Sequence, residues 1–213
     1  MPEIKDSPYV VAMVIDVVNS RRGNRASQHA ALLQAAGEIN EAIPAIDDLR
    51  PTVGDEFQGI YATVGMALTA LYRLRLAVAP EIDLRAGLGG GELTVIDAER
   101  GIQDGSAWWL AREAIDEVKS LAQSPGYRSS RTAVKDSRPG LPSHADALSR
   151  LIDSCLHRLR PGVAKTLLGL LDGKDNAEVA TQQGISGSAN SQRIATNDLR
   201  ILADAIQALS DLP

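Results

Sequence analysis

Two acidic residues, Asp16 and Asp55, have the side chains and the positions that metal-dependent chemistry needs. Asp16 ends the apolar run 9–15, and Asp55 lies in the segment 53–58, Val-Gly-Asp-Glu-Phe-Gln. Two strands that each carry a carboxylate at one end place both carboxylates on the same edge of a sheet. There they would hold a divalent cation against the phosphates of a nucleotide. The alternative is that both are turn residues that bond local backbone N–H groups.

The elements that must position these residues form an α+β pattern. Apolar runs, helical spacing and proline or glycine stops predict the order β-α-β-β-α-β-β-α-β. Gly89-Gly90-Gly91 is predicted to turn the chain between two strands, and the sheet is predicted to be antiparallel with helices on one face. The predicted elements are strand 9–16, helix 27–43 with Ser27 as N-cap, strands 50–53 and 57–61, helix 65–79, strands 82–88 and 92–96, helix 106–122 and strand 127–134.

A polar segment, 135–143, contains two prolines and a glycine and predicts a domain boundary. It would separate domain 1–138 from domain 143–213. Apolar residues at helical spacing predict that everything after the boundary is helical. The predicted helices are 145–159, 163–171, 177–183 and 189–209, the last with possible breaks.

The segment 176–194 resembles the helix-turn-helix of bacterial regulators. It has a short helix, Gly184 at the turn, and a serine that can cap the next helix. In that interpretation 186–196 is the recognition helix in the DNA groove. The alternative is a helical hairpin for packing or dimerisation, because the segment is poor in Lys and Arg. The residues predicted to contact DNA are Ser186, Ser188, Asn190, Ser191, Gln192, Arg193 and Asn197.

Composition limits the functions that the chain can have. The formal net charge of -5 argues against a nucleic-acid coat over the whole chain, although one small DNA-binding face remains compatible with it. Cys155 is the only cysteine, so an intrachain disulfide is excluded and a reducing cytoplasm is expected. The apolar stretches are much shorter than the ~20 residues of a membrane helix. The sequence therefore predicts a cytoplasmic protein with no membrane partner.

Four segments carry a resemblance to the class III nucleotidyl cyclases. They are 15–20 (Ile-Asp-Val-Val-Asn-Ser), 54–57 (Gly-Asp-Glu-Phe), 85–91 (Arg-Ala-Gly-Leu-Gly-Gly-Gly) and 105–107 (Gly-Ser-Ala). The second is also similar to the signature hairpin of diguanylate cyclases. With its helical tail, the chain as a whole resembles the SatD family of bacterial proteins. The resemblance implies a ferredoxin-like or cyclase-like palm sandwich followed by an all-α helix-turn-helix domain.

The same resemblance implies a metal and nucleotide site. Asp16 and Asp55 would bind Mg²⁺ or Mn²⁺, and Glu56 would be a third carboxylate, as in the diguanylate cyclase pattern. The loop after the first strand would present backbone N–H groups and positive charge to the phosphates. The implied nucleotide-binding residues are Val17, Asn19, Ser20, Arg21, Arg22 and Gly54.

Three positions depart from the cyclase pattern. Pro51 occupies the place of a purine-reading lysine, and Trp109 and Glu113 occupy the places of the Asn and Arg that stabilise the transition state. Metal coordination would therefore survive while cyclisation is lost.

Three functions follow from these observations. The first is a DNA-binding transcriptional regulator, expected to be a homodimer, that senses a nucleotide or metal through a degenerate cyclase-like domain. The second is a divergent metal-dependent nucleotidyl cyclase or nucleotidyltransferase. The third is a structural module with neither activity.

Overall fold

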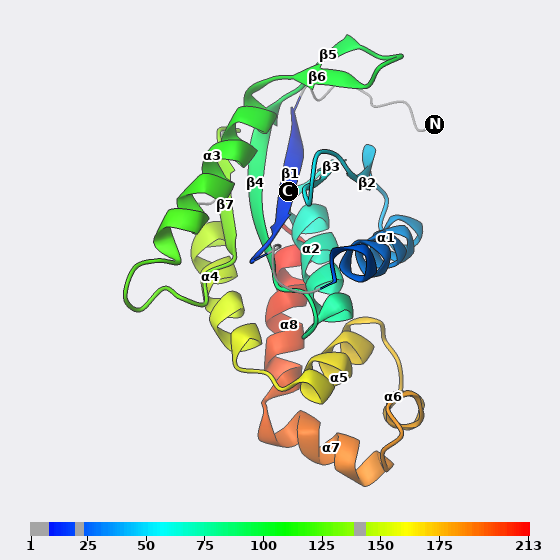
Figure 1. The fold of residues 1–213 in the computed structure, drawn as a ribbon. Coiled ribbons are helices and arrows are strands. Elements are labelled where there is room, and N and C mark those ends of the chain that lie inside the picture. Colours follow the sequence, from blue (N-terminus) through cyan, green and yellow to red (C-terminus); the bar gives the residue numbers. More distant parts are fainter. Residues whose placement is uncertain (1–8, 20–23, 139–143) are drawn as a thin grey trace.

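The computed structural model describes residues 9–19, 24–138 and 144–213, which form an α+β fold around a five-stranded sheet (Figure 1). The strands are β1 (Tyr9–Val17), β2 (Asp47–Pro51), β3 (Phe57–Tyr61), β4 (Leu84–Glu92), β5 (Thr94–Asp97), β6 (Ile102–Asp104) and β7 (Thr132–Asp136). The helices are α1 (Arg25–Ala42), α2 (Val64–Val78), α3 (Ser106–Leu121), α4 (His144–His157), α5 (Pro161–Leu171), α6 (Asn176–Gln182), α7 (Gly187–Thr196) and α8 (Leu199–Ser210).

The sheet has the strand order β2-β3-β1-β4-β7, and helices cover both of its faces (Figure 1). Side chains alternate along β1, so Met13 and Ile15 join the core under α1 and α2, whereas Ala12 and Val14 join the core under α3. The prediction of helices on one face is therefore wrong. The antiparallel prediction holds for β1, β2, β3 and β4, but β7 runs parallel to β4.

The glycine-rich segment lies within a strand and does not form the predicted turn. β4 continues through Gly89, Gly90 and Gly91 and pairs with β1 as far as Glu92. A Cβ on Gly87 would overlap the backbone of α3 at Ala111 and Ile115. The glycines of β4 therefore let α3 lie directly on the strand with no side chain between them.

Several predicted boundaries move in the structure. The first helix begins at Arg25, because Asn24 accepts hydrogen bonds from the backbone N–H groups of Ala26 and Ser27 and is the N-cap in place of Ser27. The last predicted helix is broken at Asp198, which has a left-handed φ of 49°. The predicted strand 127–134 begins only at Thr132. β5 and β6 pair into a separate hairpin beyond the end of the sheet (Figure 1).

The C-terminal helices share one hydrophobic core with the sheet. Leu167 of α5 and Ile206 of α8 belong to the same buried cluster as Leu71 of α2 and Leu88 of β4. The segments predicted as domains 1–138 and 143–213 therefore pack around a common interior. Nowhere in the three described ranges is there a helix with both the length and the apolar character needed to cross a membrane.

Candidate functional site

A cavity of about 340 Å³ lies between the end of β1, the tip of the β2–β3 hairpin and the first turns of α1. We call it the α1 pocket. Asp55 lies at the hairpin tip and is one of the residues that line the cavity. The lining residues are Val17, Arg25, Ala26, Gln28, His29, Leu32, Gly54, Asp55 and Phe57. The mixture of apolar walls with a few polar groups, and the volume, are typical of a small-molecule site.

The cationic and aromatic groups of the α1 pocket come from the first turns of α1 and from the start of β3. The rings of His29 and Phe57 have centroids 6.1 Å apart at an angle of 50°. Phe57 is buried in the core, whereas Arg25 and His29 are exposed on α1. Phe57 is thus fixed by packing, while Arg25 can reach an anionic ligand.

Asp16 faces the other side of the sheet, toward α3. Its Oδ2 lies 3.0 Å from Nζ of Lys119, and its Oδ1 lies 3.9 Å from Nε of Arg85. Arg85 is the residue of β4 directly opposite Asp16 in the strand pairing. Within the described residues, Oδ1 of Asp16 is buried and accepts no hydrogen bond. The Asp16 carboxylate is therefore held by two cations and does not face Asp55 in the α1 pocket.

Glu56 also faces α3, where Arg112 binds it through both guanidinium ends at 2.6 and 2.9 Å. Gln58 donates a further hydrogen bond to the same carboxylate at 2.7 Å. The hydrogen bond from Arg112 lowers the pKa of Glu56, and it outweighs the opposing effect of partial burial. Glu56 is thus a carboxylate already neutralised within the fold.

The described residues do not fit the metal site that the sequence predicted. Asp16 and Glu56 are paired with cations of α3 and β4, and Asp55 lies in the α1 pocket. In the part of the chain that the structure describes, no three His, Cys, Asp or Glu side chains are grouped so that they could hold one ion. Asp16 and Glu56 therefore share the cations of α3, whereas Asp55 lines the α1 pocket.

The predicted nucleotide-binding residues are only partly visible. Val17 and Gly54 line the α1 pocket, and Gly54 has the left-handed φ of 73° that the hairpin tip requires. Asn19 is exposed beyond the end of β1, with a φ of 58°. Ser20, Arg21 and Arg22 lie outside the described residues.

The predicted helix-turn-helix segment forms two short helices, α6 and α7, that pack against α5. Asp175 caps α6, Gly184 turns the chain at a φ of 63°, and Ser186 caps α7. Four predicted contact residues on or next to α7 are exposed in addition to Ser186. They are Ser188, Ser191, Gln192 and Asn197.

Asn190 and Arg193 do not face outward as the prediction required. Asn190 is 1% exposed, and its amide bonds Thr166 at 2.7 Å and Asn176 at 3.0 Å. Nη1 of Arg193 donates to Oε1 of Gln183 at 2.6 Å and to a backbone carbonyl of α5. Both side chains hold α5, α6 and α7 together, because buried polar groups must find partners inside the fold.

Comparison with known proteins assigns the chain to a family. The model of the SatD family matches residues 9–212, which is nearly the whole sequence. The chain belongs to the SatD family. A comparison with curated proteins gives no significant match.

Solved structures with partial similarity to this SatD family chain include nucleotidyl cyclases. A rhodopsin-guanylyl cyclase catalytic core of converted specificity, in complex with ATPalphaS, is 17% identical with a TM-score of 0.36, over 49% of this chain and 70% of that one. The dimeric guanylyl cyclase domain of RhoGC from the aquatic fungus Blastocladiella emersonii is 15% identical with a TM-score of 0.36, over 49% of this chain and 71% of that one. A bacterial light-regulated adenylyl cyclase is 12% identical with a TM-score of 0.39, over 59% of this chain and 74% of that one.

Sequence reasoning missed the cations that hold the carboxylates of the SatD family chain. Arg112 and Lys119 are seven residues apart on α3 and therefore lie on one face of that helix. That Arg85 lies beside Asp16 follows only from the pairing of β1 with β4. The spacing on α3 could have indicated a cationic stripe, but its carboxylate partners depend on which face of the sheet α3 covers.

Proposed function

We propose that this SatD family chain binds a nucleotide in the α1 pocket and acts as a sensor. The observation that carries the proposal is the combination, in one cavity of about 340 Å³, of the cation of Arg25, the exposed ring of His29 and the acidic residue Asp55. A guanidinium suits a phosphate group, and the exposed imidazole ring of His29 suits the face of a base. The Asp55 carboxylate can accept hydrogen bonds from a ribose or a base.

We propose Mg²⁺ or Mn²⁺ only as the counterion that accompanies the nucleotide phosphates. Asp55 is the single carboxylate in the lining that the structure describes for the α1 pocket. Because Asp16 and Glu56 are neutralised by Lys119 and Arg112, binding without turnover fits the arrangement better than catalysis does.

Replacing Asp55 with asparagine is expected to weaken nucleotide binding about tenfold, the effect of one lost charge-assisted hydrogen bond. Arg25→Gln is expected to weaken it similarly, with the largest loss for triphosphates. The measurement is the thermal unfolding midpoint and calorimetric affinity with ATP and GTP, each with and without Mn²⁺. The matched control is Asp48→Asn, an exposed carboxylate of β2 outside the pocket. Equal affinities for wild type, Asp55→Asn and Arg25→Gln would refute the site.

A divergent metal-dependent nucleotidyl cyclase or nucleotidyltransferase is the second candidate. The observation in its favour is the buried Oδ1 of Asp16, which no donor among the described residues satisfies. Product analysis of the same Mn²⁺ samples decides between the two candidates. A cyclic mononucleotide with pyrophosphate, or a transferred nucleotidyl group, would establish the enzyme, whereas saturable binding without product would establish the sensor.

DNA binding by α6 and α7 is a separate candidate, supported by the exposed polar side chains of α7. Gln192→Ala is expected to abolish a salt-dependent affinity for duplex DNA, and Gln207→Ala, an exposed glutamine of α8, serves as the control. Arg193→Ala is a poor test, since it also removes the bracing of α7 against Gln183. An affinity that Gln192→Ala leaves unchanged, or no DNA binding by the full chain, would exclude this role.

A further inference from the structure

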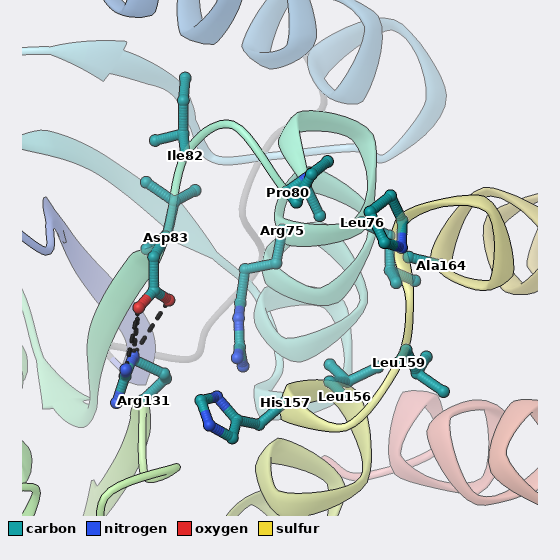
Figure 2. A pocket seen from close by; sticks show the side chains of 13 residues that line it. Arg75, Leu76, Pro80, Ile82, Asp83, Arg131, Leu156, His157, Leu159 and Ala164 are labelled. Carbon is teal, nitrogen blue, oxygen red and sulfur yellow. Dashed lines mark hydrogen bonds and ion pairs between the residues drawn. The ribbon is translucent and has the colours of Figure 1, made fainter. Parts of the chain in front are cut away.

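A second cavity, of about 170 Å³, lies where the sheet meets the C-terminal helices (Figure 2). We call it the junction pocket. Its walls come from the end of α2, the turn into β4, the residue before β7, the end of α4 and the start of α5. The apolar part of the lining includes Leu76, Pro80, Leu156, Leu159 and Ala164.

The polar part of the lining begins with Arg75, whose side chain is only 10% exposed. Its Nη1 bonds Asp153 and Thr132. Among the described residues, its Nε and Nη2 make no hydrogen bond, yet neither atom is sealed from solvent. Figure 2 shows the guanidinium pointing toward the imidazole of His157 across the cavity. Nearly buried donors of this kind require a partner, either water or a ligand.

Arg131 supplies a second guanidinium, 12% exposed in its side chain. Asp83 accepts from its Nε at 2.9 and 3.0 Å and from its Nη2 at 2.8 Å (Figure 2). Asp83 is itself 47% exposed. Of the described residues that line the junction pocket, Asp83 is the one carboxylate, against two guanidinium groups and one imidazole. Because Nη1 of Arg131 already donates to the backbone carbonyls of Arg128 and Ser130 at 2.8 Å each, a bound anion would share Nε and Nη2 of Arg131 with Asp83.

We propose that the junction pocket binds a small oxyanion, with Arg75, Arg131 and His157 as its donors. A phosphate or a short carboxylate has the acceptor geometry that a guanidinium prefers, and either fits a volume of about 170 Å³. The walls belong both to the sheet side and to α4 and α5, so the bound anion links the C-terminal helices to the sheet. Binding to the folded chain alone raises its stability.

The test uses the whole chain carrying Arg25→Gln. This substitution removes the cation of the α1 pocket, so that anion binding there does not obscure binding in the junction pocket. Inorganic phosphate and acetate are titrated at constant ionic strength, with the unfolding midpoint and calorimetric heat as readouts. His157→Ala is expected to weaken binding about tenfold. Asp83→Asn is expected to tighten it by a similar factor, because it frees donors of Arg131. Arg158→Ala, which removes an exposed cation next to His157 in the chain but outside the lining, is the control for a general loss of positive charge.

A weaker anion affinity in His157→Ala and a stronger one in Asp83→Asn, with the affinity of the control unchanged, would establish the oxyanion site. Saturation by phosphate alone identifies a phosphate site, and saturation by acetate identifies a carboxylate site. The proposal is overturned if neither anion saturates, or if His157→Ala and Asp83→Asn bind as the control does. Nucleotide binding in the α1 pocket is measured with Arg25 present, so the two proposals fail independently.

Discussion

Replacing Asp153 with alanine is expected to lower the free energy of unfolding by about 4 kcal/mol. Asp153 of α4 is fully buried and pairs with Arg75 of α2. Its Oδ2 also accepts the backbone N–H groups of Arg131 and Thr132 at 2.7 Å each. The truncation leaves a nearly buried guanidinium without its carboxylate and removes the side-chain acceptor of two backbone N–H groups, and each loss is costly. The measurement is urea unfolding followed by circular dichroism.

Two companion variants show whether charge pairing is the cause. Asp204→Ala, an exposed carboxylate of α8, is expected to change the free energy of unfolding by less than about 0.5 kcal/mol. Arg75→Met combined with Asp153→Leu is expected to cost less than the two separate losses added together, because no unpaired charge remains. A loss below about 1 kcal/mol for Asp153→Ala would show that α4 is held by apolar contacts alone.

Replacing Gly89 with alanine is expected to destabilise the fold by about 3 kcal/mol, the upper range for overpacking a core. The added Cβ would overlap backbone atoms of Ala107 and Ala111 in α3. Backbone cannot move aside as a side-chain tip can, so α3 must shift from β4 as a whole. Thermal and urea unfolding measure the effect.

Gly37→Ala is the matched control, because the new methyl group at this helical position meets no atom within 4 Å. That variant is expected to stabilise α1 by about 0.5 to 1 kcal/mol, since alanine is the better helix former. If Gly89→Ala is as stable as the wild type, the close approach of α3 to β4 is wrong.

The fold was predictable where local pattern decides structure. Several elements lie close to their predicted positions: the strand β1, the hairpin of β2 and β3, and the helices α2 and α3. The spacing of apolar residues along the sequence indicates each of them. The turn predicted at Gly89 to Gly91 is wrong, because glycine permits a tight turn and also permits the close packing of a helix on a strand. Local pattern does not specify which face of the sheet α3 covers, nor that β7 adds to β4 in parallel.

The candidate site was less predictable than the fold. Asp16 and Asp55 do come at strand ends, but the alternation of β1 points Asp16 toward α3, while the hairpin tip turns Asp55 toward α1. Lys119 lies 103 residues after Asp16 in the chain, and no local rule connects them. The sequence predicts Asn190 as an exposed contact in the DNA groove. Its position on α7 alone does not reveal its buried partner Thr166, which belongs to another helix.

The packing of α8 against α2 has a consequence for folding during synthesis. Leu209 and Ile206 complete the buried cluster that contains Leu68 and Leu71, and the backbone N–H of Gly65 at the start of α2 donates to the carbonyl of Leu212. The ribosome makes α2 long before α8, so the matching face of α2 has no native cover while the intervening segments emerge. A nascent apolar surface of that kind is exposed to misassembly and is a natural client surface for chaperones.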